Sequence, residues 1–140
     1  MTELKPGDIA TIERLVEESD LAAAISPDPD DRFPRVFATS RLVALMELAA
    51  ARLMRPLLKE GELSVGVNLE ITHEAPTPPG ALVKATAKFL EKTGKIYRFE
   101  VTAEDGAGPI GHGAHGRAIV TTERLVAGAK KRLGGASSGD

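Results

Sequence analysis

The chain has 140 residues, and its 18 basic and 20 acidic side chains leave a formal net charge of −2. A chain of this length usually forms one domain, and the charge balance does not favour a nucleic-acid partner. The absence of cysteine excludes disulfides, a thiol nucleophile and cysteine-ligated zinc. The N-terminus lacks the apolar core of a secretion signal, and the longest apolar segment is too short to cross a bilayer. We therefore expect a soluble, cytoplasmic protein with no membrane partner.

The first part of the chain combines short apolar runs with turn residues. Residues 8–17 fit either a helix or a first strand, because the apolar spacing is helical but β-branched residues follow a turn. Residues 19–25 predict a short helical turn with Ser19 as its cap. A polar loop over 26–32, rich in proline and aspartate, then leads to the next element.

Residues 37–58 form the longest and most apolar helical pattern in the sequence. Apolar residues recur there at three- and four-residue spacing, namely Leu42, Leu45, Met46, Ala49, Leu53 and Met54. Thr39 and Ser40 are predicted to cap the first turn, and Pro56 is predicted to end the helix. A single acid, Glu47, lies within the apolar pattern. Such a carboxylate must be paired, hydrogen-bonded, protonated or used in chemistry.

The second half of the sequence alternates with a period of two, which is typical of β-strands. Over 63–72 the odd positions are apolar, which predicts one apolar face made of Leu63, Val65, Val67, Leu69 and Ile71. Further strands are predicted over 81–91, 95–104 and 110–123, separated by turns that contain glycine. Consecutive strands with short turns predict an antiparallel sheet.

Together these patterns predict an α+β fold, in which a curved antiparallel sheet wraps around the central helix. The single domain is expected over 1–125. Residues 126–140 are expected to hold the end of a C-terminal helix, predicted over 124–133, and a flexible tail over 134–140. Exposed edge strands, and a helix that is apolar beyond one face, indicate that a second copy covers part of the surface. We expect a homodimer, with a tetramer as the larger alternative.

Few residues offer chemistry, because the sequence contains no phosphate-binding loop, nucleophile elbow or HExxH motif. Thr39, Glu47 and His73 supply the hydroxyl, carboxylate and imidazole that acyl transfer needs. Thr39 and Glu47 are about 12 Å apart along a helix, so they can share a site only if more than one element or subunit contributes. Each residue also has a plainer role: a helix cap, a surface ion pair or a surface imidazole.

Three further polar side chains lie near the predicted last strand. His112 and His115 are three positions apart, which places them on opposite faces of a strand and argues against a shared metal ion. Arg117 fits either a structural ion pair or a contact to a carboxylate or phosphate. The basic run at 130–132 fits a solvated helix end, with a contact to a phosphorylated ligand as the alternative.

Segments 33–39, 45–47, 72–80 and 111–118 read FPRVFAT, LME, THEAPTPPG and GHGAHGRA. In order and in nearly constant spacing over residues 5–125, they resemble the motifs of hotdog-fold acyl-CoA thioesterases, most closely the fluoroacetyl-CoA thioesterase branch. The resemblance implies a hotdog fold, a dimer with its sites at the subunit interface, and an acyl-CoA substrate. It implies neither a metal nor a bound cofactor, since coenzyme A enters only as part of the substrate.

The resemblance also implies roles for single residues. It implies a catalytic set of Thr39, Glu47 and His73. It further implies substrate contacts from a gating ring, a backbone group near the carbonyl and a cation, namely Phe33, Gly66 and Arg117. The chain departs from the family pattern at Ser40-Arg41 and at Gly116, and it has only five aromatic residues. The resemblance therefore implies the class of reaction and leaves the acyl group open.

Three functions follow from these residues. The first is a thioesterase that hydrolyses a small acyl-CoA to the free acid and CoA. The second is a non-catalytic hotdog protein that binds an acyl-CoA as a sensor or assembly subunit. The third is a hydratase or dehydratase, a chemistry that usually pairs an aspartate with the histidine. The strand before His73 offers Asn68 and Glu70 but no aspartate, so this reading is the least favoured.

Overall fold

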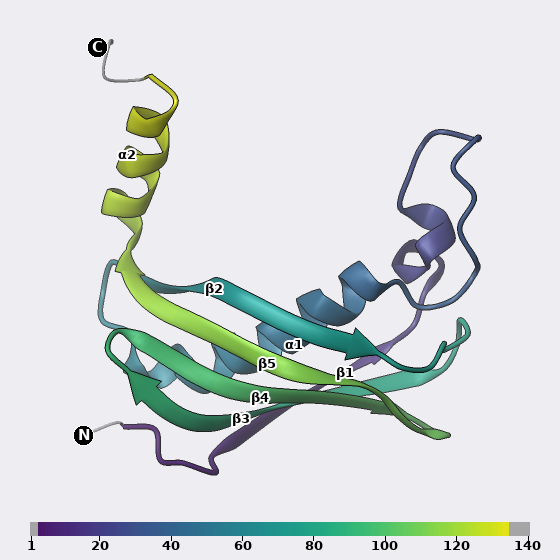
Figure 1. Ribbon diagram of the computed structural model, residues 1–140, viewed down its shortest axis with the longest axis horizontal. Coiled ribbons are helices and arrows are strands. Elements are labelled where there is room, and N and C mark those ends of the chain that lie inside the picture. Colours follow the sequence, from purple (N-terminus) through teal and green to yellow (C-terminus); the bar gives the residue numbers. More distant parts are fainter. Residues whose placement is uncertain (1–2, 135–140) are drawn as a thin grey trace.

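The computed structural model describes residues 3–134, and its main feature is a five-stranded sheet curled around one long helix (Figure 1). The helix is α1, Thr39–Met54. The strands are β1 Ile9–Leu15, β2 Glu62–His73, β3 Leu82–Thr93, β4 Ile96–Asp105 and β5 Gly108–Thr121. They are arranged in the order β1-β3-β4-β5-β2, and every neighbouring pair is antiparallel. The predicted α+β class and curved antiparallel sheet are confirmed.

The core lies between α1 and the inner face of the sheet. Of the residues that the spacing predicted to share a face, Leu53 is only partly buried. The helix buries the others together with one more alanine: Leu42, Leu45, Met46, Ala49, Ala50 and Met54. Against them pack alternate residues of β3 and β4, namely Val83, Ala85, Ala87, Phe89, Phe99, Val101 and Ala103. The alanines at the centre of β3 let the helix approach the strand closely.

The central helix is shorter than the predicted 37–58. Phe37 is still extended and bridges to Leu21, and Ala38 is the N-cap. The predicted capping role of Thr39 is wrong, because Thr39 is the first helical residue and no side chain caps this helix end. After Met54 the chain tightens into a 3₁₀ turn over Arg55–Leu57, where proline supplies no backbone N–H for the α-helical ladder.

The N-terminal segments settle two points that the sequence left uncertain. The segment 8–17 is a strand and not a helix: Ile9–Leu15 within it form β1, which pairs with β3. The predicted helical turn over 19–25 is present as two 3₁₀ turns, Glu18–Asp20 and Ala22–Ala24. The predicted cap at Ser19 is wrong, because Glu17 caps the first turn and exchanges hydrogen bonds with Asp20.

Strand β2 departs most from its predicted pattern. Its register with β5 shifts between Gly66 and Asn68, so Val67 forms a β-bulge. A bulge exchanges the two faces of a strand: Gly66 faces α1 before it, and Ile71 packs on the core after it. Leu63 and Val67 are consequently 45% and 47% exposed. The single apolar face predicted for 63–72 is therefore wrong, and β2 presents apolar side chains along an edge of the sheet.

The C-terminal helix α2, Thr122–Arg132, begins directly after β5 and has no buried residue. It starts slightly earlier than predicted and projects away from the sheet (Figure 1). The basic run at 130–132 is exposed, as expected for a solvated helix end. Apart from Gly134, the tail predicted over 134–140 lies outside the described residues. Within residues 3–134, no helix has the length and apolarity that a membrane crossing requires.

Candidate functional site

Two of the predicted site residues meet at one end of the sheet. Thr39 begins α1 and His73 ends β2, and the Thr39 Oγ1 and His73 Nδ1 atoms are 2.7 Å apart, a hydrogen bond. They line a pocket of about 360 Å³ together with Ala22, Pro34, Val36, Phe37, Glu74, Ala75 and Pro76. The hydroxyl of Thr39 thus orients an imidazole instead of capping the helix.

The second nitrogen of His73 has no partner. Within the described part of the chain, Nε2 is buried and makes no hydrogen bond. An unsatisfied buried polar atom is costly, so such an atom usually marks a place where something else binds. If the Thr39 hydroxyl donates to Nδ1, the proton of the neutral ring sits on Nε2 and requires an acceptor such as a carboxylate.

Glu47 lies about two helical turns further along α1 and belongs to a different cluster. Its ion-pair partner is Arg117, with 4.0 Å between Glu47 Oε2 and Arg117 Nη1, rather than an arginine of its own helix. The Glu47 side chain is 42% exposed. One chain therefore brings Thr39 and His73 together and holds Glu47 apart from them.

Gly66 creates the space that the Glu47 carboxylate occupies. A Cβ atom at position 66 would lie 2.6 Å from Glu47 Oε2 and 3.2 Å from His115 Cε1. Any side chain there would displace the carboxylate, so this position requires glycine for close approach. Gly66 therefore lies beside Glu47, and its predicted contact with a substrate stays a prediction.

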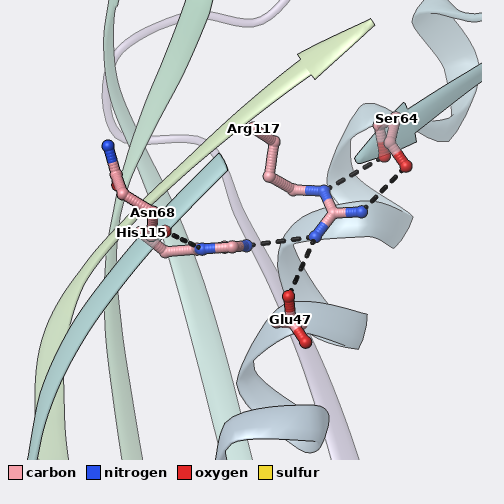
Figure 2. A network of polar contacts seen from close by, with 5 residues as sticks. All are labelled: Glu47, Ser64, Asn68, His115 and Arg117. Carbon is pink, nitrogen blue, oxygen red and sulfur yellow. Dashed lines mark hydrogen bonds and ion pairs between the residues drawn. The ribbon is translucent and has the colours of Figure 1, made fainter. Parts of the chain in front are cut away.

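Arg117 is anchored inside this second cluster (Figure 2). Its Nε donates to Ser64 Oγ at 3.1 Å, its Nη2 donates to the Ser64 carbonyl at 3.0 Å, and its Nη1 donates to His115 Nε2 at 3.1 Å. The residue is only 7% exposed. Burial lowers the pKa of the Arg117 guanidinium, and the Glu47 carboxylate opposes that shift. A substrate contact from Arg117 stays a prediction, because its donors are already directed at groups of this chain.

His115 has one defined protonation state in this arrangement. Its Nδ1 donates to the carbonyl of Asn68 at 2.8 Å, and its Nε2 accepts from Arg117. A carbonyl oxygen only accepts and a guanidinium only donates, so the imidazole is neutral with its proton on Nδ1. Burial lowers the pKa of His115 and the Arg117 cation lowers it further, against opposing effects of the Asn68 hydrogen bond and Glu47.

The sequence predictions did not find Ser64 and considered His115 only as a metal ligand. The available signal was the spacing of His115 and Arg117, two residues apart and therefore on one face of β5. His112 lies on the opposite face, as expected, where its side chain is 60% exposed and pairs with Glu74. Within residues 3–134, no group of three or more histidine, aspartate or glutamate side chains is arranged to hold a metal ion.

The remaining predicted residue, Phe33, lies just outside the pocket. It is 50% exposed, and the pocket wall begins at the next residue, Pro34. Its gating role stays a prediction. The predicted site residues therefore gather at two places, the pocket at Thr39 and His73 and the cluster of Glu47, Gly66 and Arg117.

Comparisons with known proteins identify the family of this chain. The family model for fluoroacetyl-CoA-specific thioesterase matches residues 16–123. A fluoroacetyl-CoA thioesterase from Streptantibioticus cattleyicolor is 42% identical over 100 residues, which cover 71% of this chain and 72% of the relative. A solved structure of the fluoroacetyl-CoA thioesterase FlK superposes with a TM-score of 0.88 at 36% identity, covering 93% of this chain and 98% of that one.

A more distant solved structure has the same architecture. A hypothetical protein from Thermus thermophilus, described as a thioesterase superfamily member, is 26% identical with a TM-score of 0.85, and the match covers 100% of each chain. The match to the family model extends over most of the chain, from the end of β1 to the start of α2. The chain therefore belongs to the fluoroacetyl-CoA-specific thioesterase family and is a hotdog-fold thioester hydrolase.

Proposed function

We propose that the protein hydrolyses a small acyl-CoA to the free acid and CoA, with Thr39, Glu47 and His73 as its catalytic residues. The observation that carries this proposal is the pair of complementary groups on α1 and β2. The Glu47 carboxylate is partly exposed above Gly66, and His73 has a buried nitrogen that finds no hydrogen-bond partner in the described part of the chain. A carboxylate and an imidazole are the groups that activate water and move protons in acyl transfer.

The reaction needs neither a metal nor a bound cofactor. Glu47 either removes a proton from the water that attacks the thioester carbonyl, or attacks the carbonyl itself to form an anhydride that water then hydrolyses. In both routes the carbon–sulfur bond breaks, and the CoA thiolate takes a proton that His73 delivers. Thr39 holds the imidazole for that transfer, and the Gly66 N–H is the proposed donor to the oxyanion.

A homodimer would complete the site. β2 is an edge strand with exposed Leu63 and Val67, and an edge of this kind invites pairing with a second copy. When two copies of β2 pair antiparallel about a two-fold axis near Leu69 and Glu70, the Gly66 region of one strand approaches the His73 end of the other. Glu47 of one chain would then complement the imidazole of the partner.

The charged variant Val67→Lys tests this interface. A lysine at the centre of the edge opposes pairing, so we expect a folded monomer in sedimentation with hydrolysis largely lost. Lys84→Gln, an exposed change on β3, is the control and should leave both properties unchanged. A Val67→Lys variant that is still dimeric and active would show that this edge is not the interface.

The acyl group is proposed to be small. The pocket beside Thr39 and His73 is about 360 Å³ and is lined mainly by proline, valine, alanine and phenylalanine. A relative is named a fluoroacetyl-CoA thioesterase, and fluoroacetyl-CoA is a thioester of a short acid. Phe33, next to this pocket, is proposed to cover the bound acyl group.

A free-thiol assay over short, branched, aromatic and halogenated acyl-CoAs tests the reaction. We expect the wild-type protein to release CoA from at least one substrate, and Glu47→Gln to lower the rate by at least about 10²-fold, the scale of a lost acid–base group. Glu91→Gln, an exposed change on β3, is the matched control. Saturable binding without thiol release over the whole panel would instead support a non-catalytic acyl-CoA-binding protein.

A further inference from the structure

His115 takes no part in the proposed chemistry, yet it lies at the centre of the Glu47 cluster, which consists of Glu47, Ser64, His115 and Arg117. It is 2% exposed on the inner face of β5, and its ring centroid is 6.4 Å from that of Phe99. Both of its nitrogens are engaged within the chain, with the carbonyl of Asn68 and the guanidinium of Arg117. Neither nitrogen is available to a substrate, so His115 can act only through its neighbours.

Arg117 is the neighbour that connects His115 to the reaction. An arginine side chain is long and flexible, so its planar guanidinium can orient a neighbouring group only when several of its own N–H donors are held in place. Ser64 fixes one edge of the group through Nε and Nη2. His115 fixes Nη1, which is the same nitrogen that faces Glu47 at 4.0 Å. Figure 2 shows the guanidinium between these three partners.

We propose that His115 is a positioning residue, whose neutral imidazole holds Arg117 so that the guanidinium keeps the Glu47 carboxylate above Gly66. The inference rests on the proposed function, because it concerns the orientation of Glu47 during hydrolysis. It also assigns the Arg117 cation to Glu47 and not to the phosphates of coenzyme A. The contacts of Arg117 with Ser64 and His115 already direct its donors inward.

Three substitutions of His115 separate its roles. His115→Phe fills the space beside Phe99 but offers no acceptor. His115→Gln places a carbonyl oxygen near the former Nε2, so it can still accept from Arg117. His115→Asn is shorter and reaches only the position of Nδ1, next to the Asn68 carbonyl. If holding Arg117 is what matters, only the glutamine variant retains the function.

The measurement is the separate determination of kcat and KM on the best acyl-CoA substrate. We expect His115→Phe and His115→Asn to lower kcat about 10-fold or more, because a small misplacement of a reacting group is costly. KM should stay within about two-fold, since ground-state binding is unchanged. His115→Gln should recover most of the loss. Arg98→Gln, an exposed arginine on the neighbouring strand β4, is the control and should resemble the wild type.

A truncated substrate tests the assignment of Arg117. The N-acetylcysteamine thioester of the same acid carries the reacting bond but none of the phosphates of coenzyme A. We expect Arg117→Gln to lower kcat/KM by the same factor on both thioesters. A loss confined to the acyl-CoA would overturn the inference and assign Arg117 to the phosphates.

The possible outcomes distinguish this inference from the proposed function. A wild-type protein that hydrolyses neither thioester would overturn the proposed reaction and with it the role of His115. An active wild type with unchanged kcat in folded His115→Phe, or with no recovery in His115→Gln, would overturn only the inference. Melting temperatures establish which variants are folded. If His115→Phe does not fold, the comparison of His115→Gln with His115→Asn decides the point.

Discussion

The first turn of α1 and its middle carry polar clusters of opposite character. At the first turn, Thr39 orients His73 beside a pocket, and one buried nitrogen of the imidazole has no hydrogen-bond partner among residues 3–134. In the middle, Arg117 is fully engaged, whereas the Glu47 carboxylate beside it stays 42% exposed. One cluster lacks an acceptor and the other presents one. This difference supports the proposal that a single chain holds two halves of a site and that a symmetric partner joins them.

Mixing two inactive variants is the strongest test of this complementarity. Glu47→Gln and His73→Ala should each lose at least about 10²-fold in activity, because each removes an acid–base group. If Glu47 of one chain serves His73 of the other, every mixed dimer has one site with both defects and one intact site. Unfolding and reassembling an equal mixture should then restore about a quarter of the wild-type rate, because about half of the dimers are mixed.

The same experiment also has an outcome that would refute a shared site. If all three catalytic residues of a site came from one chain, each site of a mixed dimer would carry one defect, and no activity would return. Each variant unfolded and reassembled alone is the control for losses during the procedure. A mixture no more active than these controls would refute the sharing of the site between subunits while leaving the catalytic residues unchallenged.

Gly66→Ala is expected to disturb the Glu47 cluster and leave the Thr39 cluster intact. The new methyl group would lie 2.6 Å from Glu47 Oε2, which is the end of a flexible side chain, so the fold can adjust and the carboxylate must move. A misplaced base should cost about 10- to 100-fold in kcat. Gly128→Ala, where a Cβ meets nothing within 4 Å, is the matched control. Unchanged kcat in a folded Gly66→Ala protein would separate the Glu47 position from catalysis.

Thr39 offers a smaller change in the other cluster. Thr39→Ala removes the 2.7 Å contact to His73 Nδ1, and we expect kcat to fall about 10-fold because the imidazole loses its orientation. Thr39→Ser keeps a hydroxyl and should retain most of the activity. Since Ala38 and not Thr39 is the N-cap of α1, the melting temperature should change little in either variant. A large drop in melting temperature in Thr39→Ala would instead support the capping role that the sequence suggested.

The sequence predicted the fold well wherever one face of an element packs on the core. The alternation over 81–91 and 95–104 located β3 and β4 closely, because their inner residues face α1 along the whole strand. It failed within β2, where the bulge at Val67 exchanges the faces. From Leu63 onward, apolar residues occupy the odd positions both before and after the bulge. The sequence pattern alone therefore does not reveal where the strand exchanges its two faces.

The site was predictable in part for a similar reason. Thr39 and His73 belong to motifs that resemble a known family, and the structure brings them into contact. The residues that hold Glu47 in place could not be predicted in this way. Ser64 and Arg117 are far apart in sequence and meet only through the register of β2 with β5. No local pattern predicts such a pairing. The sequence left Arg117 open between a structural ion pair and a substrate contact, and the fold adds the intrachain contacts to Ser64, His115 and Glu47.

The smallest predicted effect is a pH dependence of stability that belongs to the Glu47 cluster alone. The pKa of His115 in the folded protein lies below its ordinary value of 6.5, chiefly because of burial, with the Arg117 cation adding to the shift and the Asn68 carbonyl and Glu47 opposing it. Below about pH 6.5 the unfolded chain therefore binds a proton that the folded chain does not. Stability should fall as the pH decreases through this window.

Urea unfolding between pH 8 and pH 5 measures this dependence. His115→Gln should flatten the slope below pH 6.5, whereas His112→Gln, an exposed histidine on the same strand, should retain it. Asp20 does not interfere: burial opposes its ionisation, but hydrogen bonds from Arg14 and the Glu17 backbone lower its pKa below 3.8, so its contribution is lost only in stronger acid. Equal slopes in the wild type and His115→Gln would contradict the proposed role of His115. They would mean that His115 accepts a proton without leaving Arg117, whereas the imidazole must stay neutral to hold the guanidinium in place.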